Sequence, residues 1–229
     1  MNLWDEIWNK DTYSNKKVRN RKSTRKLKKY IDLGINFKKY NRIVDFGAGG
    51  GYVTLELLRI NPNIHEILLI DNSLNGLERA KDNLNEWKNK NVFLKQDLNF
   101  PIYNIENKYD LAIAFSILEH LENIESGIDN IYRTLKTKGE VIMIWSNKKS
   151  IFHLQHVIFE KLGIWRYGLT KEIEESQIDF LIKDKFEIVS KKIEPCVGDK
   201  GILTIIDNLM HICFHKYGRY IFLRLQKVE

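Results

Sequence analysis

The chain has 229 residues, of which 43% are hydrophobic and 29% charged, with a formal net charge of +7. This composition excludes a disordered chain and a disulfide-stapled one, because there is enough apolar content for a core and the only cysteines are Cys196 and Cys213. No apolar run is long enough to cross a bilayer, and residues 1–8 lack the features of a signal peptide. We therefore expect a single-domain protein of a reducing cytoplasm.

The positive charge is concentrated near the N-terminus. Residues 1–40 hold 12 of the 37 Lys and Arg but only 4 of the 30 Asp and Glu. The basic run 16–29 is either a solvated helix face or a site that binds phosphate on a nucleic acid, a lipid or a nucleotide sugar. No aromatic residues alternate with the basic ones in this run, which disfavours nucleic acid as a partner without excluding it.

Ahead of the run stand Trp4, Trp8 and Tyr13. Trp4 and Trp8 are four residues apart and would share one face of a helix.

The first strand and its turn are the most informative part of the chain. The apolar run 43–46 is followed by Gly47, Gly49 and Gly51, and then by apolar residues at helical spacing. The pattern predicts a buried strand, a tight turn and a helix. Glycine lets the backbone approach a ligand closely, and amides at a helix start can receive its polar groups. The dinucleotide spacing Gly-x-Gly-x-x-Gly fits in neither register.

Three further strands each end in a polar residue: 67–70 before Asp71, 92–96 before Asp97, and 109–115 before Ser116. Ser73 then suits the N-cap of a helix. An acid after the second strand can accept hydrogen bonds from ribose hydroxyls. The alternative is a carboxylate stabilised by the dipole of the next helix.

The later elements continue the alternation of helix and strand. The pattern predicts a helix over 128–135, a strand over 140–145, an apolar helical element within 150–169, a helix over 173–182, a strand over 186–193, a helix over 202–213 and a strand over 219–227. Continuous alternation favours one α/β domain.

Several motifs in order resemble the class I S-adenosylmethionine-dependent methyltransferases. They are the Asp45-x-Gly47-x-Gly49-x-Gly51 turn, the acids after the second and third strands, and the stretch Leu118-Glu-His-Leu121. That stretch is similar to a signature of family members that methylate small molecules, including those of quinone biosynthesis. The resemblance covers about residues 40–146.

The resemblance implies a Rossmann-like doubly wound α/β fold with seven strands in the order 3-2-1-4-5-7-6 and strand 7 antiparallel. It divides one methyltransferase domain, 1–229, into a basic N-terminal helical arm or lid (1–40), a cofactor-binding core (41–146), a substrate-side helical insertion (147–183) and the C-terminal part of the sheet (184–229).

The resemblance also implies S-adenosylmethionine as the cofactor. Asp71 would bind the ribose hydroxyls, and Asp97 with Leu98 would hold the adenine. Tyr13 is the preferred contact near the methionine portion; the alternative is that the terminal segment merely packs on the sheet. The implied cofactor-binding residues are Tyr13, Asp45, Gly47, Ala48, Gly49, Asp71, Asn72, Asp97, Leu98, Phe115 and Ser116.

In-line methyl transfer to a hydroxyl benefits from a general base, whereas an amine can react without one. The candidate bases are His120, His153 and His156, with a structural hydrogen bond as the alternative for each. His211 and His215 have a metal-like spacing but no evident third ligand, so no metal site is expected.

The residues after the fourth strand exclude two subclasses. The Asp/Asn-Pro-Pro-Tyr/Phe motif of base amino methylation is absent there, and so is a Pro-Cys nucleophile. Pro195-Cys196 is such a dipeptide, but it comes after the sixth strand, and we expect it on the wrong side of the fold.

These observations predict methyl transfer to oxygen or nitrogen of a small-molecule biosynthetic intermediate. An anionic intermediate is compatible with this prediction. Two alternatives stay open: a methyltransferase acting on RNA or another polyanion through the basic arm, and a cofactor-binding protein without transfer activity.

Overall fold

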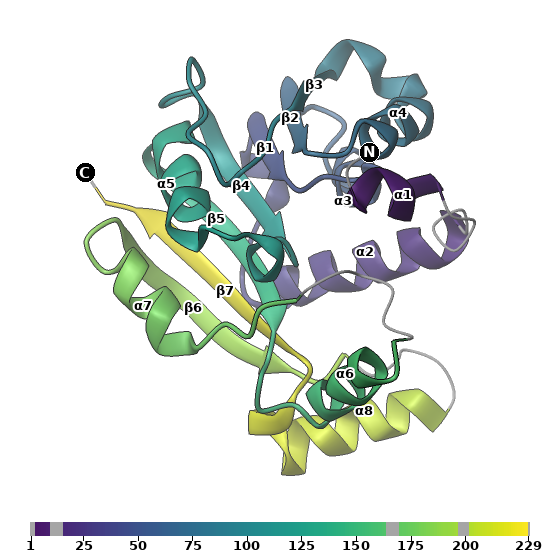
Figure 1. The fold of residues 1–229 in the computed structure, drawn as a ribbon. Coiled ribbons are helices and arrows are strands. Elements are labelled where there is room, and N and C mark those ends of the chain that lie inside the picture. Colours follow the sequence, from purple (N-terminus) through teal and green to yellow (C-terminus); the bar gives the residue numbers. More distant parts are fainter. Residues whose placement is uncertain (1–2, 10–15, 164–169, 197–201, 229) are drawn as a thin grey trace.

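The computed structural model of the chain describes residues 3–9, 16–163, 170–196 and 202–228 (Figure 1). In these ranges seven strands form one sheet in the order β3-β2-β1-β4-β5-β7-β6. The strands are β1 (Arg42–Phe46), β2 (Glu66–Asp71), β3 (Asn91–Lys95), β4 (Tyr109–Phe115), β5 (Leu135–Ser146), β6 (Phe186–Glu194) and β7 (Tyr220–Lys227). Strand β7 is antiparallel to both β5 and β6, and the other pairs are parallel. The predicted order and direction are confirmed.

Helices cover both faces of this sheet (Figure 1). The α-helices are α1 (Leu3–Asn9), α2 (Lys16–Asp32), α3 (Tyr52–Ile60), α4 (Leu74–Asn83), α5 (Ile124–Thr134), α6 (Ile151–Lys161), α7 (Glu175–Ile182) and α8 (Ile202–Cys213). Short 3-10 helices are η2 (Phe37–Lys39), η3 (Asn85–Lys90), η4 (Leu118–His120) and η5 (His215–Tyr217). No helix in the described ranges is long and apolar enough to span a bilayer.

Side chains along each strand point alternately to the two faces of the sheet, and each face has its own hydrophobic core. In β5, Ile142 and Ile144 pack with residues of α2, α3 and α4, whereas Val141, Met143 and Trp145 pack with residues of α5 and α7. Because successive side chains of a strand point to opposite faces, a strand buried on both sides reads as a continuous apolar run. This explains why the central strands stand out in the sequence.

Some predicted boundaries were wrong by a few residues. Helix α5 begins at Ile124 rather than 128, because the Asn123 side chain accepts a hydrogen bond from the amide of Ser126 at 3.0 Å and caps the helix there. Helix α7 begins at Glu175 rather than 173, and β5 begins at Leu135 rather than 140. The cap at Ser73 was predicted correctly: its hydroxyl accepts from the amide of Gly76 at 3.0 Å.

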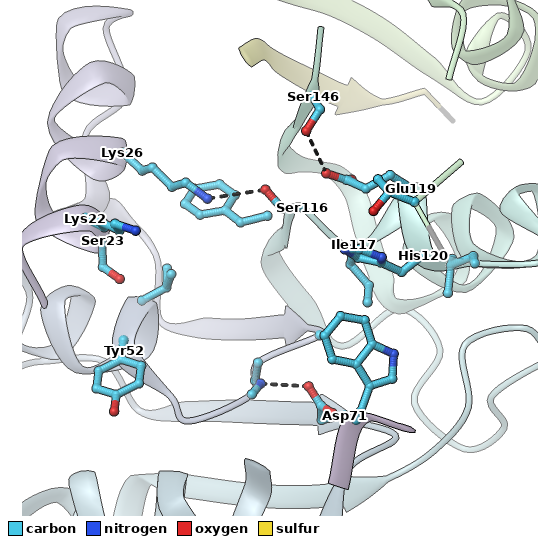
Figure 2. A pocket seen from close by; sticks show the side chains of 18 of the residues that line it. Lys22, Ser23, Lys26, Tyr52, Asp71, Ser116, Ile117, Glu119, His120 and Ser146 are labelled. Carbon is cyan, nitrogen blue, oxygen red and sulfur yellow. Dashed lines mark hydrogen bonds between the residues drawn. The ribbon is translucent and has the colours of Figure 1, made fainter. Parts of the chain in front are cut away.

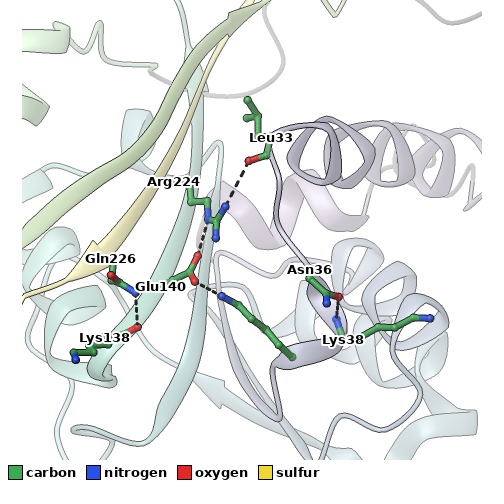
Figure 3. A network of polar contacts seen from close by, with 8 residues as sticks. Leu33, Asn36, Lys38, Lys138, Glu140, Arg224 and Gln226 are labelled. Atoms are coloured by element: carbon green, nitrogen blue, oxygen red, sulfur yellow. Dashed lines mark hydrogen bonds and ion pairs between the residues drawn. The ribbon is translucent and has the colours of Figure 1, made fainter.

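Helix α2, which carries the basic run, is fixed to the sheet near its C-terminal end. The Tyr30 side chain is fully buried, and its hydroxyl donates to the carbonyl oxygens of Met143 in β5 and Leu223 in β7. The chain after the helix is held through Arg224, which donates to the Leu33 carbonyl at 3.5 Å (Figure 3). These contacts determine which face of α2 points toward the carboxyl ends of the strands.

Arg224 belongs to a buried ion-pair network (Figure 3). Its Nε lies 2.6 Å from a carboxylate oxygen of Glu140, and Lys39 contacts the other oxygen. The network links β5 and β7 to the segment between α2 and β1.

Candidate functional site

A cavity of about 390 Å³ opens at the carboxyl ends of the central strands. In open α/β sheets this edge, near the reversal of strand order, is where ligands bind. The described residues that line it are Trp4, Trp8, Arg19, Lys22, Ser23, Arg25, Lys26, Gly47, Ala48, Gly49, Tyr52, Val53, Asp71, Asn72, Asp97, Leu98, Asn99, Phe115, Ser116, Ile117, Glu119, His120, Leu121, Ser146, Thr170, Cys196, Arg219 and Tyr220.

The glycine turn forms one wall of this cavity. Gly47, Gly49 and Gly51 have φ of +69°, +50° and +69°, a conformation that residues with a Cβ rarely adopt. A Cβ on Gly49 would lie 2.2 Å from a ring carbon of Trp8. The sequence therefore needs glycine at position 49 both for the backbone shape and for the close approach of an aromatic ring.

Asp45 does not line the cavity. It is 3% exposed and accepts a hydrogen bond from the Thr54 hydroxyl at 2.8 Å, which ties the end of β1 to α3. Burial raises the pKa of this carboxyl to about 7. Asp45 thus supports the turn from beneath, which differs from the direct contact expected from the sequence.

Asp71 faces the cavity beside the turn (Figure 2). One carboxylate oxygen accepts from the amide of Gly49 at 2.7 Å, and the other accepts from the amide of Ser73 at 2.8 Å. Burial nevertheless raises its pKa above the ordinary value. The carboxylate is therefore held rigidly, with lone pairs left over for a ligand's hydroxyls.

The other predicted cofactor residues divide between the two ends of the cavity. Asn72, Asp97 and Leu98 line the end formed by β2 and β3. The Asp97 carboxylate accepts from the backbone and side-chain nitrogens of Asn99, each at 2.9 Å. Ala48 also lines the cavity.

Phe115 and Ser116 form the cavity wall at the end of β4. Ser116 has φ of +55°, and its amide donates to the carbonyl of Ile144 in β5 at 2.7 Å. Its hydroxyl is 3.4 Å from the Lys26 ammonium group (Figure 2). The Phe115 ring stacks on Tyr30, with centroids 5.6 Å apart.

Helix α1 lies over the glycine turn. Trp8 packs against Ile7 and Tyr52, and the Asp5 carboxylate accepts from the Ser73 hydroxyl at 2.7 Å at the start of α4. Trp4 lines the cavity as well. Tyr13, the preferred aromatic contact of the sequence prediction, lies outside the described residues.

Two of the three candidate histidines have described side chains, and these two are not brought together. His120 lines the cavity, and its ring meets that of Trp4 edge-on with centroids 4.8 Å apart. His153 does not line the cavity; its Nε2 is 2.8 Å from a carboxylate oxygen of Glu172. The side chain of His156 lies outside what the structure describes. Of the two histidines with described side chains, His120 lines the cavity and His153 does not.

Glu119 is a site residue that the sequence interpretation missed. It is 3% exposed, lines the cavity, and has one carboxylate oxygen 3.4 Å from the Ser146 hydroxyl (Figure 2). Its other oxygen has no hydrogen-bond partner among the described residues. Burial raises the pKa of Glu119 to about 7, the range of an effective general base.

The second group that was missed is the cavity-facing side of α2. Lys26 lies under the rim of the cavity, and burial lowers its pKa to about 8. A solvated helix face, one of the two alternatives for residues 16–29, does not describe this side. The spacing of Arg19, Lys22, Lys26 and Tyr30 at three or four residues was the available signal.

The expected location of Cys196 was wrong. It lines the cavity, because β6 and β5 are both antiparallel to β7 and therefore parallel to each other. Their carboxyl ends consequently meet at the same edge of the sheet. Burial raises the pKa of the Cys196 thiol to about 11, so the thiol is protonated at neutral pH and is no ready nucleophile.

The sheet order, the glycine turn and the carboxylate after β2 define a class I methyltransferase fold. A family model described as a methyltransferase domain matches residues 44–141. That segment is 98 of the 229 residues, and over it the chain is similar to methyltransferase domains.

One curated relative is a ubiquinone biosynthesis O-methyltransferase of Rickettsia bellii, 25% identical over 118 residues, which cover 51% of this chain and 46% of the relative. The chain thus matches about half the length of that relative.

Solved structures extend the likeness of the fold over nearly the whole chain. A putative methyltransferase in complex with the Trm112 activator, from Haloferax volcanii, has a TM-score of 0.73 at 12% identity and covers 99% of this chain and 98% of its own. The N-methyltransferase NodS of Bradyrhizobium japonicum, in complex with S-adenosylhomocysteine, has a TM-score of 0.60 at 15% identity, with coverage of 91% and 87%.

Proposed function

We propose that this chain is an S-adenosylmethionine-dependent methyltransferase that modifies oxygen or nitrogen of a small-molecule biosynthetic intermediate. The observation that carries the proposal is the glycine cradle beside Asp71: the turn carries no side chain larger than the methyl group of Ala48, and the carboxylate is fixed by the Gly49 and Ser73 amides. Names of relatives such as the ubiquinone biosynthesis O-methyltransferase support the small-molecule class.

The residues present fit the cofactor. Gly47, Ala48 and Gly49 would receive its methionine portion, and Asp71 would bind the ribose hydroxyls. Asn72, Asp97 and Leu98 would enclose the adenine at the end formed by β2 and β3. When bound, S-adenosylmethionine supplies a methyl group activated by its sulfonium.

The protein's own contribution is to position the acceptor and to exclude water. The wall made by Phe115, Ser116 and His120 lies beyond the glycine turn, where an acceptor would sit. We assign acceptance of the acceptor's proton to Glu119 or His120. Glu119 is favoured, because it is buried, has an oxygen without a partner in the described structure, and has a pKa near neutrality. His153 pairs with Glu172 outside the cavity.

Calorimetric titration of S-adenosylmethionine and S-adenosylhomocysteine tests the cofactor. Asp71→Ala should weaken binding by about 1–3 kcal/mol, since the ligand's hydroxyls lose a charged acceptor. Asp82→Ala, on the exposed side of α4, removes a carboxylate outside the cavity and should leave the affinity unchanged. No binding by the wild type would refute the proposal.

The base is tested by single-turnover methylation of a panel of hydroxyl and amine acceptors. With a hydroxyl acceptor, Glu119→Gln should lower the rate by about 10²–10⁴-fold with little change in cofactor affinity. Equal rates for Glu119→Gln and the wild type, with a loss in His120→Gln instead, would move the role to His120.

A further inference from the structure

We propose that the end of the cavity beneath α2 binds an anionic group of the acceptor, a carboxylate or a phosphate ester, so that the acceptor is a small organic anion. The inference rests on the proposed function and specifies its substrate class.

Five cationic side chains converge on this end of the cavity from parts of the chain far apart in sequence. They are Arg19, Lys22, Arg25 and Lys26 of α2 and Arg219, which precedes β7. In Figure 2, Lys26 extends from α2 toward Ser116. The anchoring of α2 through Tyr30 fixes this direction.

The cations are positioned mainly by uncharged groups. Arg25 donates to the Cys196 carbonyl at 3.2 Å, Lys26 donates to the Ser116 hydroxyl at 3.4 Å, and the Arg219 guanidinium lies 5.2 Å from the ring centroid of Tyr220. Lys22 has no hydrogen bond or ion pair within the described structure. Neutral partners orient a cation without neutralising its charge, so Arg25, Lys26 and Arg219 remain available to an anion.

The cluster repels itself. Burial lowers the pKa of Lys22, and the nearby charges of Arg19, Arg219 and Arg25 lower it further. Like charges at close range in a partly desolvated site destabilise the charged forms unless a counter-charge is present. Among the described lining residues, Glu119 is the one carboxylate on this side, since Asp71 and Asp97 lie at the cofactor end.

The cofactor supplies a single negative group, its carboxylate, and cannot balance the whole cluster. S-adenosylmethionine has one carboxylate, an ammonium and a sulfonium, and its net charge is positive. Its binding adds positive charge to a wall that already holds five cations. An acceptor with an acid group would balance the cluster and would also be oriented by it, with its nucleophile directed toward the glycine turn.

A small acceptor fits this arrangement better than a polymer. Arg19, Arg25 and Lys26 are partly buried and line a cavity of about 390 Å³, and the exposed side chains of Lys22 and Arg219 line it as well. Lys28, on the other side of the same helix, is exposed and does not line the cavity.

The test uses benzoate and phenyl phosphate as anionic probes and benzamide as a neutral probe of similar size. Each is titrated by ligand-observed NMR with the wild type, Lys22→Met/Lys26→Met and Lys28→Met, with and without saturating S-adenosylhomocysteine. The control Lys28→Met removes a charge from the exposed side of α2. Lys22→Met alone serves if the double variant does not fold.

At least one anionic probe should bind the wild type tenfold more tightly than benzamide. The double variant should lose at least tenfold of this affinity, and Lys28→Met should stay within twofold of the wild type. Tighter binding of benzoate indicates a carboxylate acceptor, and tighter binding of phenyl phosphate indicates a phosphate ester.

Equal binding of benzamide and the anions, or equal losses in both variants, would overturn the proposal. A loss of S-adenosylhomocysteine affinity as large as that of the anions would assign the cations to the cofactor instead. Binding of a 20-nucleotide RNA that depends on Lys22 and Lys26, without binding of the small anions, would assign them to a polyanion. If the wild type does not bind S-adenosylhomocysteine, the proposed function fails. The titration of the anions in the absence of S-adenosylhomocysteine still gives a result, so the two failures are distinguishable.

Discussion

Glu140→Gln should lower the free energy of unfolding by about 2–4 kcal/mol. The Glu140 side chain is 5% exposed and that of Arg224 is 12% exposed, and 2.6 Å separates the Arg224 Nε from a carboxylate oxygen of Glu140. Removing one partner of such a buried pair costs about 3–5 kcal/mol, because the other charge stays buried. We reduce this range because Lys39, which is 46% exposed, can turn to water and because glutamine keeps one hydrogen-bond acceptor.

The effect should depend on pH. Burial raises the pKa of Glu140, but hydrogen bonds from Arg224 and Lys39 outweigh this and hold the pKa below its ordinary value. The stabilisation is therefore complete above an unfolded pKa of about 4.3 and is lost as the pH falls through the folded pKa. The difference between wild type and variant should accordingly be smaller at pH 3 than at pH 7.

Urea unfolding followed by circular dichroism measures both effects as a shift of the midpoint at constant m-value. Glu78→Gln is the control: Glu78 pairs with Lys81 at 2.7 Å, but the two side chains are 57% and 48% exposed. We expect that variant to lose less than about 1 kcal/mol. A loss for Glu140→Gln no larger than for Glu78→Gln would refute the reasoning.

Three further predictions concern the site. Gly49→Ala should abolish cofactor binding and lower the melting temperature more than Gly163→Ala. Both positions have positive φ, but only the Cβ at position 49 would meet Trp8. Equal melting temperatures for the two variants would contradict this. In thermal unfolding, Asp45→Asn should stabilise the protein more at pH 8 than at pH 5. Burial raises the pKa of Asp45 to about 7, and a carboxyl group with a raised pKa destabilises the folded state increasingly as the pH rises toward that pKa. An equal gain in stability at both pH values would argue against this prediction. The affinity of the wild type for an anionic probe should fall roughly two- to tenfold from pH 7 to pH 9, and that of Lys26→Met should not. Burial lowers the pKa of Lys26 to about 8, and its charge is lost above that pH. The same decline in both proteins would assign the effect to another group.

The sequence was most informative where local pattern decides the structure. The apolar runs of the central strands are buried on both faces, so their positions and the turn after β1 followed from periodicity and glycine alone. The Ser73 cap was predictable for the same reason, since its partner lies three residues away. The starts of α5 and α7 were missed by a few residues: the Asn123 side chain caps α5, whereas no side chain caps α7.

The acceptor side was less predictable because distant contacts decide it. The orientation of α2 depends on Tyr30, whose hydroxyl donates to the carbonyl of Met143, 113 residues away. At the end of β4, His120 and Glu119 are neighbours in the single turn of η4, which is too short to show a helical phase. The sequence therefore directed attention to His120, whereas Glu119 is the more deeply buried of the two.

The parallel alignment of β5 and β6 has an evolutionary consequence. The segments after these two strands, the start of β7 and helix α2 all contribute to one end of the cavity, and all lie outside residues 44–141. Mutations in these flanking segments can change which molecule is recognised without altering the glycine turn or Asp71. Under the proposed function, descendants of one ancestral protein would diverge in substrate while inheriting the same glycine turn and Asp71.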